Sequence, residues 1–531
     1  MKTIKKVIIA LSLSALSIGL TAQSSQLNPM TQAMMNAYQK LIDENPQDYE
    51  TYLKRANEYY RYNQYLRALN DVDEALKYAP ENEKDTRFQA LCLRANIYEN
   101  TGKRSEALND LNAALRLYPD NYVTLYQRAN VEYELGQYGD AKLDYQRLYR
   151  LNARSLEGLF GMARCAVKEN NLGLANEYAD QAVATAPSQS DVYTRRASVR
   201  RMMGNNTGAV DDLVLALSTD NTNNKALREL VNMSDDDYTA VITGLSNAIR
   251  QAPRVGMFYY IRAVIAMNHH RYLAAIGDFK TIVDENLYDH PGLYRSMAEC
   301  SYALGNYAQA SADIEYAIGS TPDNASFYVT LAKVRRAQWR AEDALDAAEK
   351  SLSKSPDNAE ALAQKALALV DLKRYQEASD AIGEAILNDA ETPYYYMIRG
   401  WILSNYLNMP ENASTFYERV INLINPDDES IKSLQGFALL FTGKRAEAVE
   451  WIEKQLAENA DTDGLVNYYA ACLYSQAGMT DKALDCMERA LSNGYANAHD
   501  WNRNNDARIN VSPLRDFPRF SALLEQYKAI F

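Results

Sequence analysis

The sequence is poor in the residues that usually build catalytic and metal centres. Its 531 residues include only four histidines, His269, His270, His290 and His499. His269 and His270 fall at an expected turn, but no further residues with metal-ligand spacing accompany them. We also find no glycine-rich phosphate loop, no nucleophile elbow and no HExxH motif. The sequence therefore predicts a protein that is not an enzyme and has no cofactor and no metal site.

Cysteine, glycine and proline are scarce as well. The 22 glycines and 14 prolines provide no long flexible linker. The number of cysteines is odd, and no pair of them has metal-ligand spacing. We therefore expect buried thiols, with a disulfide between Cys472 and Cys486 as the alternative. The five cysteines are Cys92, Cys165, Cys300, Cys472 and Cys486.

Positive charge is also in short supply. The net charge is −13, and no basic run follows the cluster of Lys2, Lys5 and Lys6. Proteins that hold nucleic acid need a basic face for the phosphate backbone. The composition therefore argues against nucleic acid as a partner.

Long apolar runs are confined to the N-terminus. Residues 7–20 form an apolar run of fourteen residues that follows the lysine cluster and precedes the small residues of Thr21-Ala22-Gln23. This order is typical of a secretory signal peptide, and the run is too short to span a bilayer. The TAQ ending is similar to endings common in exported proteins of the Bacteroidetes. We expect cleavage after Ala22, no transmembrane segment, and a periplasmic or extracellular protein.

What the sequence does contain is a repeat. The tripeptide Arg-Ala-Asn occurs at 55–57, 94–96 and 128–130, and the chain keeps matching itself when it is shifted by 34 residues. Each unit has one small residue at the position of this alanine and a second one about twelve residues later. The first small residues are Ala56, Ala95, Ala129, Ala163, Ala197, Ala263, Ala298, Ala332, Ala366, Gly400, Gly436 and Ala471; the second are Ala68, Ala107, Ala141, Ala175, Ala209, Ala275, Ala310, Ala344, Ala378, Ala413, Ala448 and Ala483.

Each repeat is interpreted as two amphipathic helices joined by a turn. Glycine often lies between the two small residues, and proline closes many units because it cannot continue the second helix. The small residues let the two helix backbones approach closely. One hairpin cannot bury its apolar face alone, so neighbouring hairpins must stack.

This pattern resembles the tetratricopeptide repeat (TPR) family over residues 30 to 490. The stretches FQALCLRANIYENTGKRSEALNDLNAALRLYPD (88–120) and YVTLAKVRRAQWRAEDALDAAEKSLSKSPD (328–357) carry its small, aromatic and proline positions. The resemblance implies an all-α fold, a right-handed α-solenoid of about thirteen helix-turn-helix units with terminal capping helices.

The repeat pattern also predicts the organisation of the chain. Ser234 or Asp235 is expected to cap a helix in an irregular unit, and the alternative there is a divalent-cation site at Asp235 to Asp237. Phe517 and Phe520 are expected to plug the last repeat. We predict a signal peptide over 1–22, an N-terminal capping helix over 23–48, a first TPR block over 49–221, a degenerate repeat and candidate hinge over 222–255, a second TPR block over 256–492, and a C-terminal capping segment over 493–531.

The arginine of the tripeptide has a regular partner. An aspartate stands sixteen residues after it in five units, at a similar height on the opposing helix. We infer a charge-assisted pair inside each of these units, with a structural role. The pairs are Arg55 with Asp71, Arg94 with Asp110, Arg128 with Asp144, Arg196 with Asp212, and Arg262 with Asp278.

The asparagine of the tripeptide points to a different role. In the TPR family the position after the small residue faces the ligand groove, so Asn57, Asn96 and Asn130 are predicted to line it. Amides both donate and accept hydrogen bonds and can hold the backbone of an extended peptide. Aromatic and polar residues in the same phase complete the predicted groove: Tyr60, Tyr126, Tyr133, Phe160, Arg164, Tyr260, Tyr394 and Trp401.

The sequence thus favours a non-enzymatic scaffold or adaptor of the cell envelope that binds protein or an extended peptide. Two alternatives remain. Some outer-membrane sugar-binding proteins of the Bacteroidetes resemble TPR proteins of similar length, but they usually begin with a lipidated cysteine and carry large insertions, which this chain lacks. The other alternative is a structural subunit that uses its convex face.

Overall fold

The structure is a computed structural model that describes residues 29–288, 292–424, 434–458, 461, 464–493, 495, 501 and 511–528. The predicted signal peptide, His290 and His499 lie outside these residues. Within them the regular structure consists of 28 α-helices and one short 3-10 helix, without strands. No helix among these residues is both long and apolar enough to cross a membrane. The all-α prediction is confirmed.

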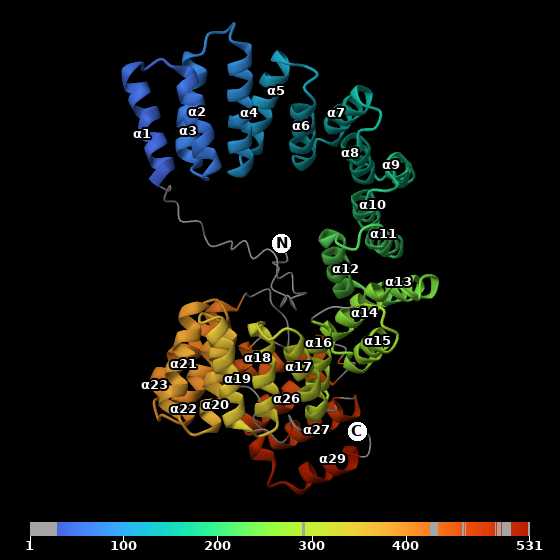
Figure 1. The fold of residues 1–531 in the computed structure, drawn as a ribbon, viewed down its shortest axis with the longest axis vertical. Coiled ribbons are helices and arrows are strands. Elements are labelled where there is room, and N and C mark those ends of the chain that lie inside the picture. Colours follow the sequence, from blue (N-terminus) through green and yellow to red (C-terminus); the bar gives the residue numbers. More distant parts are fainter. Residues whose placement is uncertain are drawn as a thin grey trace. The chain divides into compact units, whose positions relative to one another are not determined.

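The contacts divide the chain into two compact units, Met1–Ala252 and Pro253–Phe531. Unit 1 contains one leading helix and six helix pairs, in which each first helix packs on the second (Figure 1). Its helices are α1 (Pro29–Glu44), α2 (Tyr49–Arg61), α3 (Tyr65–Tyr78), α4 (Lys84–Asn100), α5 (Arg104–Leu117), α6 (Tyr122–Glu134), α7 (Tyr138–Leu151), α8 (Leu156–Lys168), α9 (Leu172–Thr185), α10 (Ser190–Met202), α11 (Asn206–Thr219), α12 (Asn224–Asp236) and α13 (Tyr238–Gln251).

Unit 2 contains seven helix pairs, a short 3-10 helix and a final helix. With the six pairs of unit 1 this makes the thirteen predicted hairpins among the described residues. Its elements are α14 (Gly256–Asn268), α15 (Tyr272–Asp284), α16 (Leu293–Ala303), α17 (Tyr307–Ser320), α18 (Ala325–Ala337), α19 (Ala341–Lys354), α20 (Ala359–Asp371), α21 (Tyr375–Asn388), α22 (Pro393–Asn405), α23 (Pro410–Leu423), α24 (Gln435–Phe441), α25 (Arg445–Glu458), α26 (Leu465–Gln476), α27 (Thr480–Ser492), η1 (Ser512–Leu514) and α29 (Pro518–Lys528).

The small residues of the repeat lie where paired helices meet. Ala95 on α4 and Ala107 on α5 are fully buried and belong to one cluster with Leu111 and Val131. Val131 comes from the next repeat, so the same cluster joins neighbouring hairpins. The small side chains thus let the helices approach within a pair, and larger apolar residues fill the space between pairs.

The turn within most helix pairs contains one residue in the left-handed backbone region. This conformation favours glycine and asparagine, which explains why these residues punctuate the repeat. His270 occupies this position with φ 58°, and its Nδ1 lies 2.7 Å from the Tyr272 hydroxyl. The histidine pair therefore has a structural explanation in the turn.

Two units have glycine instead of alanine at the first small position. At Gly400 an added Cβ would lie 2.6 Å from the ring of the buried Tyr417. At Gly436 it would lie 2.3 Å from the Trp451 ring. Bulky aromatic residues of the opposing helix therefore require glycine in these two units.

We expect Gly400→Ala to destabilise unit 2 by about 1–3 kcal/mol, because the added methyl group overlaps the Tyr417 ring. The matched control is Gly277→Ala in α15, where an added Cβ meets nothing within 4 Å. That change should be neutral or stabilise by up to about 1 kcal/mol. Urea denaturation of both variants checks this, and equal effects of the two changes would contradict the packing argument.

Two predictions about terminal and irregular segments need correction. Neither Ser234 nor Asp235 caps a helix, because α12 continues to Asp236; the cap of α13 is Asp237, whose carboxylate accepts from the Ala240 amide. The sequence pattern placed the helix start too early in this unit. Phe517 is 42% exposed and is no plug, whereas Phe520 is buried as expected.

None of the five cysteines forms a disulfide. Cys165, Cys300, Cys472 and Cys486 are buried, and Cys92 is half-buried with its sulfur 3.6 Å from the Thr124 hydroxyl. Burial raises the pKa of the Cys165 thiol to about 12, which keeps it protonated and unreactive at neutral pH. Four of the five predicted buried thiols are buried, and the alternative Cys472–Cys486 disulfide is absent.

Candidate functional site

The structure contains the five predicted arginine–aspartate pairs. In the first, Arg55 donates from Nε and Nη2 to the two carboxylate oxygens of Asp71, at 2.6 and 2.7 Å. The hydrogen bonds to the aspartate raise the pKa of Arg55. The same two-nitrogen contact joins the other pairs, and all five aspartates are buried: Asp71, Asp110, Asp144, Asp212 and Asp278.

Four of these arginines also bond to the element before their own hairpin, which is the leading helix α1 for Arg55 and the preceding hairpin for the other three. The sequence argument missed these contacts. The Nη1 of Arg55 donates to Gln39 at 2.6 Å, and that of Arg196 donates to Asp180 at 2.8 Å. Arg94 and Arg128 make the corresponding bonds to Asp73 and Asn112. Arg94, Arg128 and Arg196 therefore connect neighbouring hairpins, and Arg55 connects the first hairpin to α1. In three of the four cases the sequence indicates this contact by a polar residue sixteen positions before the arginine.

A pocket of about 690 Å³ lies within unit 1. Most of its wall comes from the first helices α6, α8, α10 and α12, which contact one another in this order. We call the surface formed by these four helices the inner face. The lining residues are Tyr126, Tyr145, Glu157, Phe160, Gly161, Arg164, Asp191, Thr194, Arg195, Ala197, Ser198, Val199, Arg201, Met202, Leu213, Lys225, Glu229 and Met233.

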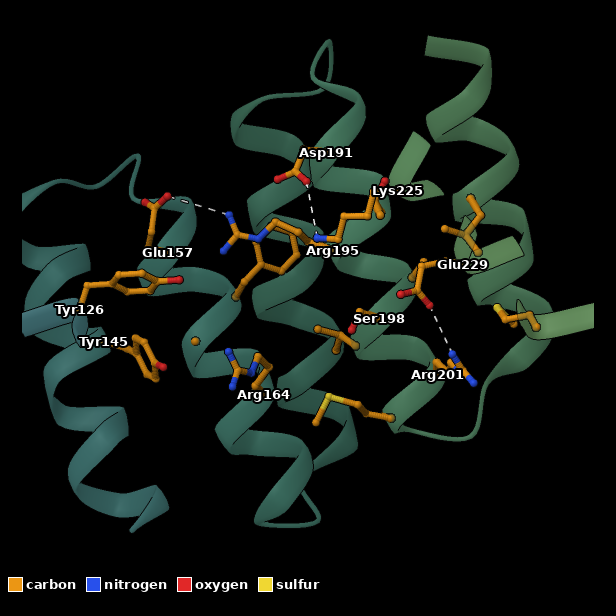
Figure 2. A pocket seen from close by; sticks show the side chains of 18 residues that line it. Tyr126, Tyr145, Glu157, Arg164, Asp191, Arg195, Ser198, Arg201, Lys225 and Glu229 are labelled. Atoms are coloured by element: carbon orange, nitrogen blue, oxygen red, sulfur yellow. Dashed lines mark hydrogen bonds and ion pairs between the residues drawn. The ribbon is translucent and has the colours of Figure 1, made fainter. Parts of the chain in front are cut away.

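One wall of the pocket is built around Tyr145. Its side chain is fully buried, and its hydroxyl donates to Asn130 Oδ1 at 2.7 Å. The ring lies against Gly161, where an added Cβ would approach it to 2.2 Å. Glycine at this position on α8 therefore makes room for the ring. Figure 2 shows Tyr145 beside Tyr126, and their ring centroids are 6.5 Å apart.

Two arginines of the pocket rest on aromatic rings. The Arg164 guanidinium lies 4.1 Å from the Tyr133 ring centroid, and that of Arg195 lies 4.4 Å from the Phe160 ring centroid. Such stacking holds the cation through the face of its planar head. The N–H groups at the edge of the guanidinium remain directed toward other partners.

The rim of the pocket carries ion pairs. Arg201 contacts Asp236 at 2.8 Å and Glu229 at 3.3 Å, and Lys225 lies 4.0 Å from Asp191. Arg195 lies 4.0 Å from Glu157 (Figure 2). These rim pairs are partly exposed, so each contributes little to stability. They leave a polar border around an aromatic and aliphatic interior, which is a common form of a ligand site.

The structure brings some of the predicted groove residues together in this pocket. Tyr126, Phe160 and Arg164 line it, with Tyr133 beneath Arg164 and Asn130 bonded to Tyr145. The inference missed Arg195, Ser198, Lys225 and Glu229 as lining residues. Ser198 was recognisable, because it occupies the position of the tripeptide asparagine in its own repeat.

Other predicted groove residues lie elsewhere. Tyr260 and Trp401 are only 1% and 5% exposed, so they pack in unit 2 and present almost no surface to a ligand. Tyr394 is half-buried. Tyr60 lies in an earlier hairpin of unit 1, where its hydroxyl accepts from Asn100 at 3.0 Å.

The two earlier asparagines make internal hydrogen bonds. Asn57 donates from Nδ2 to the Leu53 carbonyl at 2.9 Å, and Asn96 Oδ1 accepts from Gln127 at 2.6 Å. Each amide therefore spends part of its capacity inside the protein. A ligand role for Asn57, Asn96 and Asn130 stays a prediction.

The site shows no arrangement suited to metal binding. Among the described residues, no group of three or more histidine, cysteine, aspartate or glutamate side chains could hold a metal ion. Asp235 to Asp237 include the helix cap and, at Asp236, the partner of Arg201. What the arrangement offers is surface recognition through cations, aromatic rings and apolar side chains.

Helix pairs of this kind define the class of helical repeat proteins. Sequence models of known protein families identify the repeat. Models described as tetratricopeptide repeat match residues 88–121, 126–190, 295–359 and 335–402. The chain therefore contains tetratricopeptide repeats in both units, and proteins built of such repeats are typically binding scaffolds.

Relatives and solved structures are similar over limited parts. The chain is 29% identical over 126 residues to the antiviral innate immune response effector IFIT1 of Macaca fascicularis, and 30% identical over 132 residues to protein IFIT1 homolog B of Homo sapiens. These stretches cover 22% and 24% of this chain and 26% and 28% of the relatives. The chain thus spans about a quarter of the length of these relatives.

Among solved structures, the chain is similar to YrrB, whose structure is described as a TPR protein with an unusual peptide-binding site. The identity is 25%, the coverage 37% of this chain and 98% of that one, and the TM-score 0.30. A tetratricopeptide repeat protein from Parabacteroides merdae is 19% identical, with coverage of 54% of this chain and 99% of that one and a TM-score of 0.29. Yeast Tom70 is 15% identical, with coverage of 79% of this chain and 100% of that one and a TM-score of 0.36. With TM-scores this low, the fold assignment rests on the repeat models and the observed helix pairs.

Glu132, next to Tyr133 on α6, gives the site region a pH dependence. Its side chain is buried, its Oε1 lies 3.7 Å from Arg128 Nε, and its Oε2 makes no hydrogen bond within the described part of the chain. Burial and the nearby charge of Asp144 raise the pKa of Glu132 to about 7 from an ordinary value of 4.5. The folded protein therefore retains this proton over a range in which the unfolded chain has released it.

Stability should accordingly fall as pH rises from about 4.5 to about 7, and the penalty should persist above pH 7. We expect Glu132→Gln to stabilise α6 by up to about 3 kcal/mol at pH 8, and to have little effect at pH 4. Amide hydrogen exchange of α6 at both pH values measures this locally. An equal effect at both pH values would show that ionisation of Glu132 is not the cause.

Proposed function

We propose that the protein is a non-enzymatic scaffold or adaptor that binds segments of other proteins on the inner face of unit 1. The observation that carries this proposal is the pocket, because it combines rigidly stacked arginines, aromatic rings and an open polar rim on successive first helices. Asn130, one of the predicted groove asparagines, is bonded directly to its wall. The first helices α6, α8, α10 and α12 place these side chains in a continuous row, which suits an extended chain.

We further propose that the protein works in the cell envelope after export. The support is the sequence pattern of residues 1–22, with its lysines, short apolar run and small residues. Mass spectrometry of protein from the envelope fraction should find a mature chain that begins at Gln23. A full-length chain confined to the cytosolic fraction would overturn this location.

Site-specific photo-crosslinking tests the binding face. A crosslinking residue at Ser198, which is exposed in the pocket, should capture partner proteins in cells. The matched control is Asp211 on α11, which is also exposed but lies outside the pocket lining. Capture at Asp211 without capture at Ser198 would favour the alternative of a structural subunit that uses its convex face. Binding of glycans but not of protein at Ser198 would favour the glycan alternative.

A further inference from the structure

The lining of the pocket has more cations than anions. Its positive side chains are Arg164, Arg195, Arg201 and Lys225, against three carboxylates, Glu157, Asp191 and Glu229. The excess matters because the protein as a whole has a net charge of −13. The pocket lining thus has one more cation than anions, in a protein that is acidic overall.

Arg164 is a cation that the protein itself leaves incompletely satisfied. Its guanidinium makes no hydrogen bond within the described part of the chain, and its ion partner Glu134 lies 3.9 Å from Nη2. Glu134 is itself 54% exposed, so this contact is loose. Stacking on Tyr133 nevertheless fixes the position of the Arg164 head. The result is a preorganised set of donors that faces the pocket.

Arg195 on α10, the first helix of the next hairpin, is in a similar state. Its Nη2 lies 3.5 Å from the Leu156 carbonyl, and its Nη1 lies 4.0 Å from Glu157. Glu157 already accepts a hydrogen bond from the Tyr122 hydroxyl at 2.9 Å. Figure 2 places Arg164 and Arg195 between Tyr126 and Tyr145 on one side and Lys225 and Glu229 on the other. The first helices of two neighbouring hairpins, α8 and α10, therefore each present one incompletely paired guanidinium.

Apolar side chains lie around these two cations, and Met202 is the exposed one among them. Phe160, Val199 and Met202 all line the same pocket. Met202 is 37% exposed, and its flexible thioether side chain adapts to varied aliphatic partners. A ligand that fills the pocket should therefore carry carboxylates for the arginines and aliphatic side chains between them.

We propose that the pocket binds an internal acidic segment of a partner protein, in which aspartate or glutamate side chains alternate with aliphatic residues. This inference rests on the proposed function and specifies its ligand. Arg164 and Arg195 receive two side-chain carboxylates, and the intervening aliphatic side chain lies on Met202. Side chains rather than a chain end fit best, because the inner face continues through α6 toward Asn130 and lets the bound chain pass on.

Fluorescence anisotropy with the full-length protein and labelled peptides tests this. The probe is a peptide in which Asp and Glu alternate with Leu, blocked at both ends. We expect it to bind, and its affinity to fall with added salt. A matched peptide with Asn and Gln in place of the acids should bind at least tenfold more weakly. A neutral peptide with a free C-terminal carboxylate should bind weakly as well.

Arginine variants then locate the contact. Arg164→Gln and Arg195→Gln should each raise the dissociation constant for the acidic peptide by about tenfold, the size expected for loss of one charge-assisted contact. The control is Arg228→Gln on α12, an exposed arginine of unit 1 that is not part of the pocket lining. That change should alter the dissociation constant by less than twofold. Thermal melting verifies that all three variants are folded.

Two outcomes would overturn the inference. One is equal binding of the acidic and neutral peptides, or binding of only the peptide that has a free C-terminal carboxylate. The other is an equal loss of affinity in all three arginine variants, which would indicate a diffuse charge effect. If either occurs while Ser198 still captures protein in cells, the proposed function stands and only the ligand class is wrong. If Ser198 captures nothing and no peptide binds, both proposals fail.

Discussion

Asp212→Ala should destabilise unit 1 by about 3–5 kcal/mol. The Asp212 side chain is 2% exposed, and two arginines converge on it. Arg196 donates from Nη2 at 2.6 Å, and Arg200 Nη1 lies at 3.0 Å. Burial raises the pKa of Asp212, although the hydrogen bonds from Arg196 act in the opposite direction. The intact cluster therefore adds little net stability, but removal of the carboxylate leaves two poorly exposed guanidinium groups without their main counter-charge.

The adjacent Asp211 provides the control for this prediction. It is exposed on the same helix, α11, so Asp211→Ala should change stability by less than about 0.5 kcal/mol. Hydrogen exchange of α10 and α11 and urea denaturation should both register the difference. A loss at Asp212 no larger than at Asp211 would show that the arginine–aspartate pairs do not hold the hairpins together.

Tyr145→Ala should cost about 3–5 kcal/mol, the range typical for large aromatic side chains in a core. Tyr145 is fully buried on α7, and its ring fills the space that Gly161 leaves on α8. Removal of the ring would create a cavity at the boundary between two hairpins and would withdraw one wall of the pocket. We therefore expect both lower stability of unit 1 and weaker capture at Ser198.

Tyr145→Phe separates the ring from its hydroxyl. This variant keeps the packing against Gly161 and loses only the hydrogen bond to Asn130, so it should cost about 1 kcal/mol. Denaturation of the two variants side by side provides the measurement. Equal losses for Tyr145→Ala and Tyr145→Phe would mean that the hydroxyl, not the ring, dominates this part of the fold.

Features that depend on one repeat alone could be predicted from the sequence. The pair of Arg55 and Asp71 follows from a fixed spacing within one hairpin, and the same spacing recurs in four other units. The helix pairs and their small contact residues follow from the same regularity. Local periodicity is enough here because each hairpin has nearly the same geometry.

Features that depend on how neighbouring hairpins cover one another could not be predicted in this way. Phe160 and Tyr260 occupy similar phases of the repeat and are both almost fully buried, yet only Phe160 borders the pocket of unit 1. The neighbours that cover the two rings differ: the Arg195 guanidinium lies on Phe160, and the Tyr288 ring packs against Tyr260. Arg195 was missed as a pocket residue because it precedes the conspicuous Arg196, which is bound to Asp212.

The irregular unit shows a third limit. Three consecutive aspartates there are all plausible helix caps by residue type. The structure selects Asp237, because α12 extends through Ser234 and Asp235 to Asp236. Helix ends depend on packing as well as on capping residues, so the cap could not be assigned from the sequence. A hinge in this region stays a prediction.

Oxidative footprinting of methionines tests the central claim, that the inner face of unit 1 holds a protein segment in its pocket. Met202 lines the pocket, whereas Met30 and Met409 are exposed outside it. With the acidic peptide at saturation, oxidation of Met202 should slow severalfold, and oxidation of Met30 and Met409 should not change. Unchanged oxidation of Met202 under the same conditions would contradict the account.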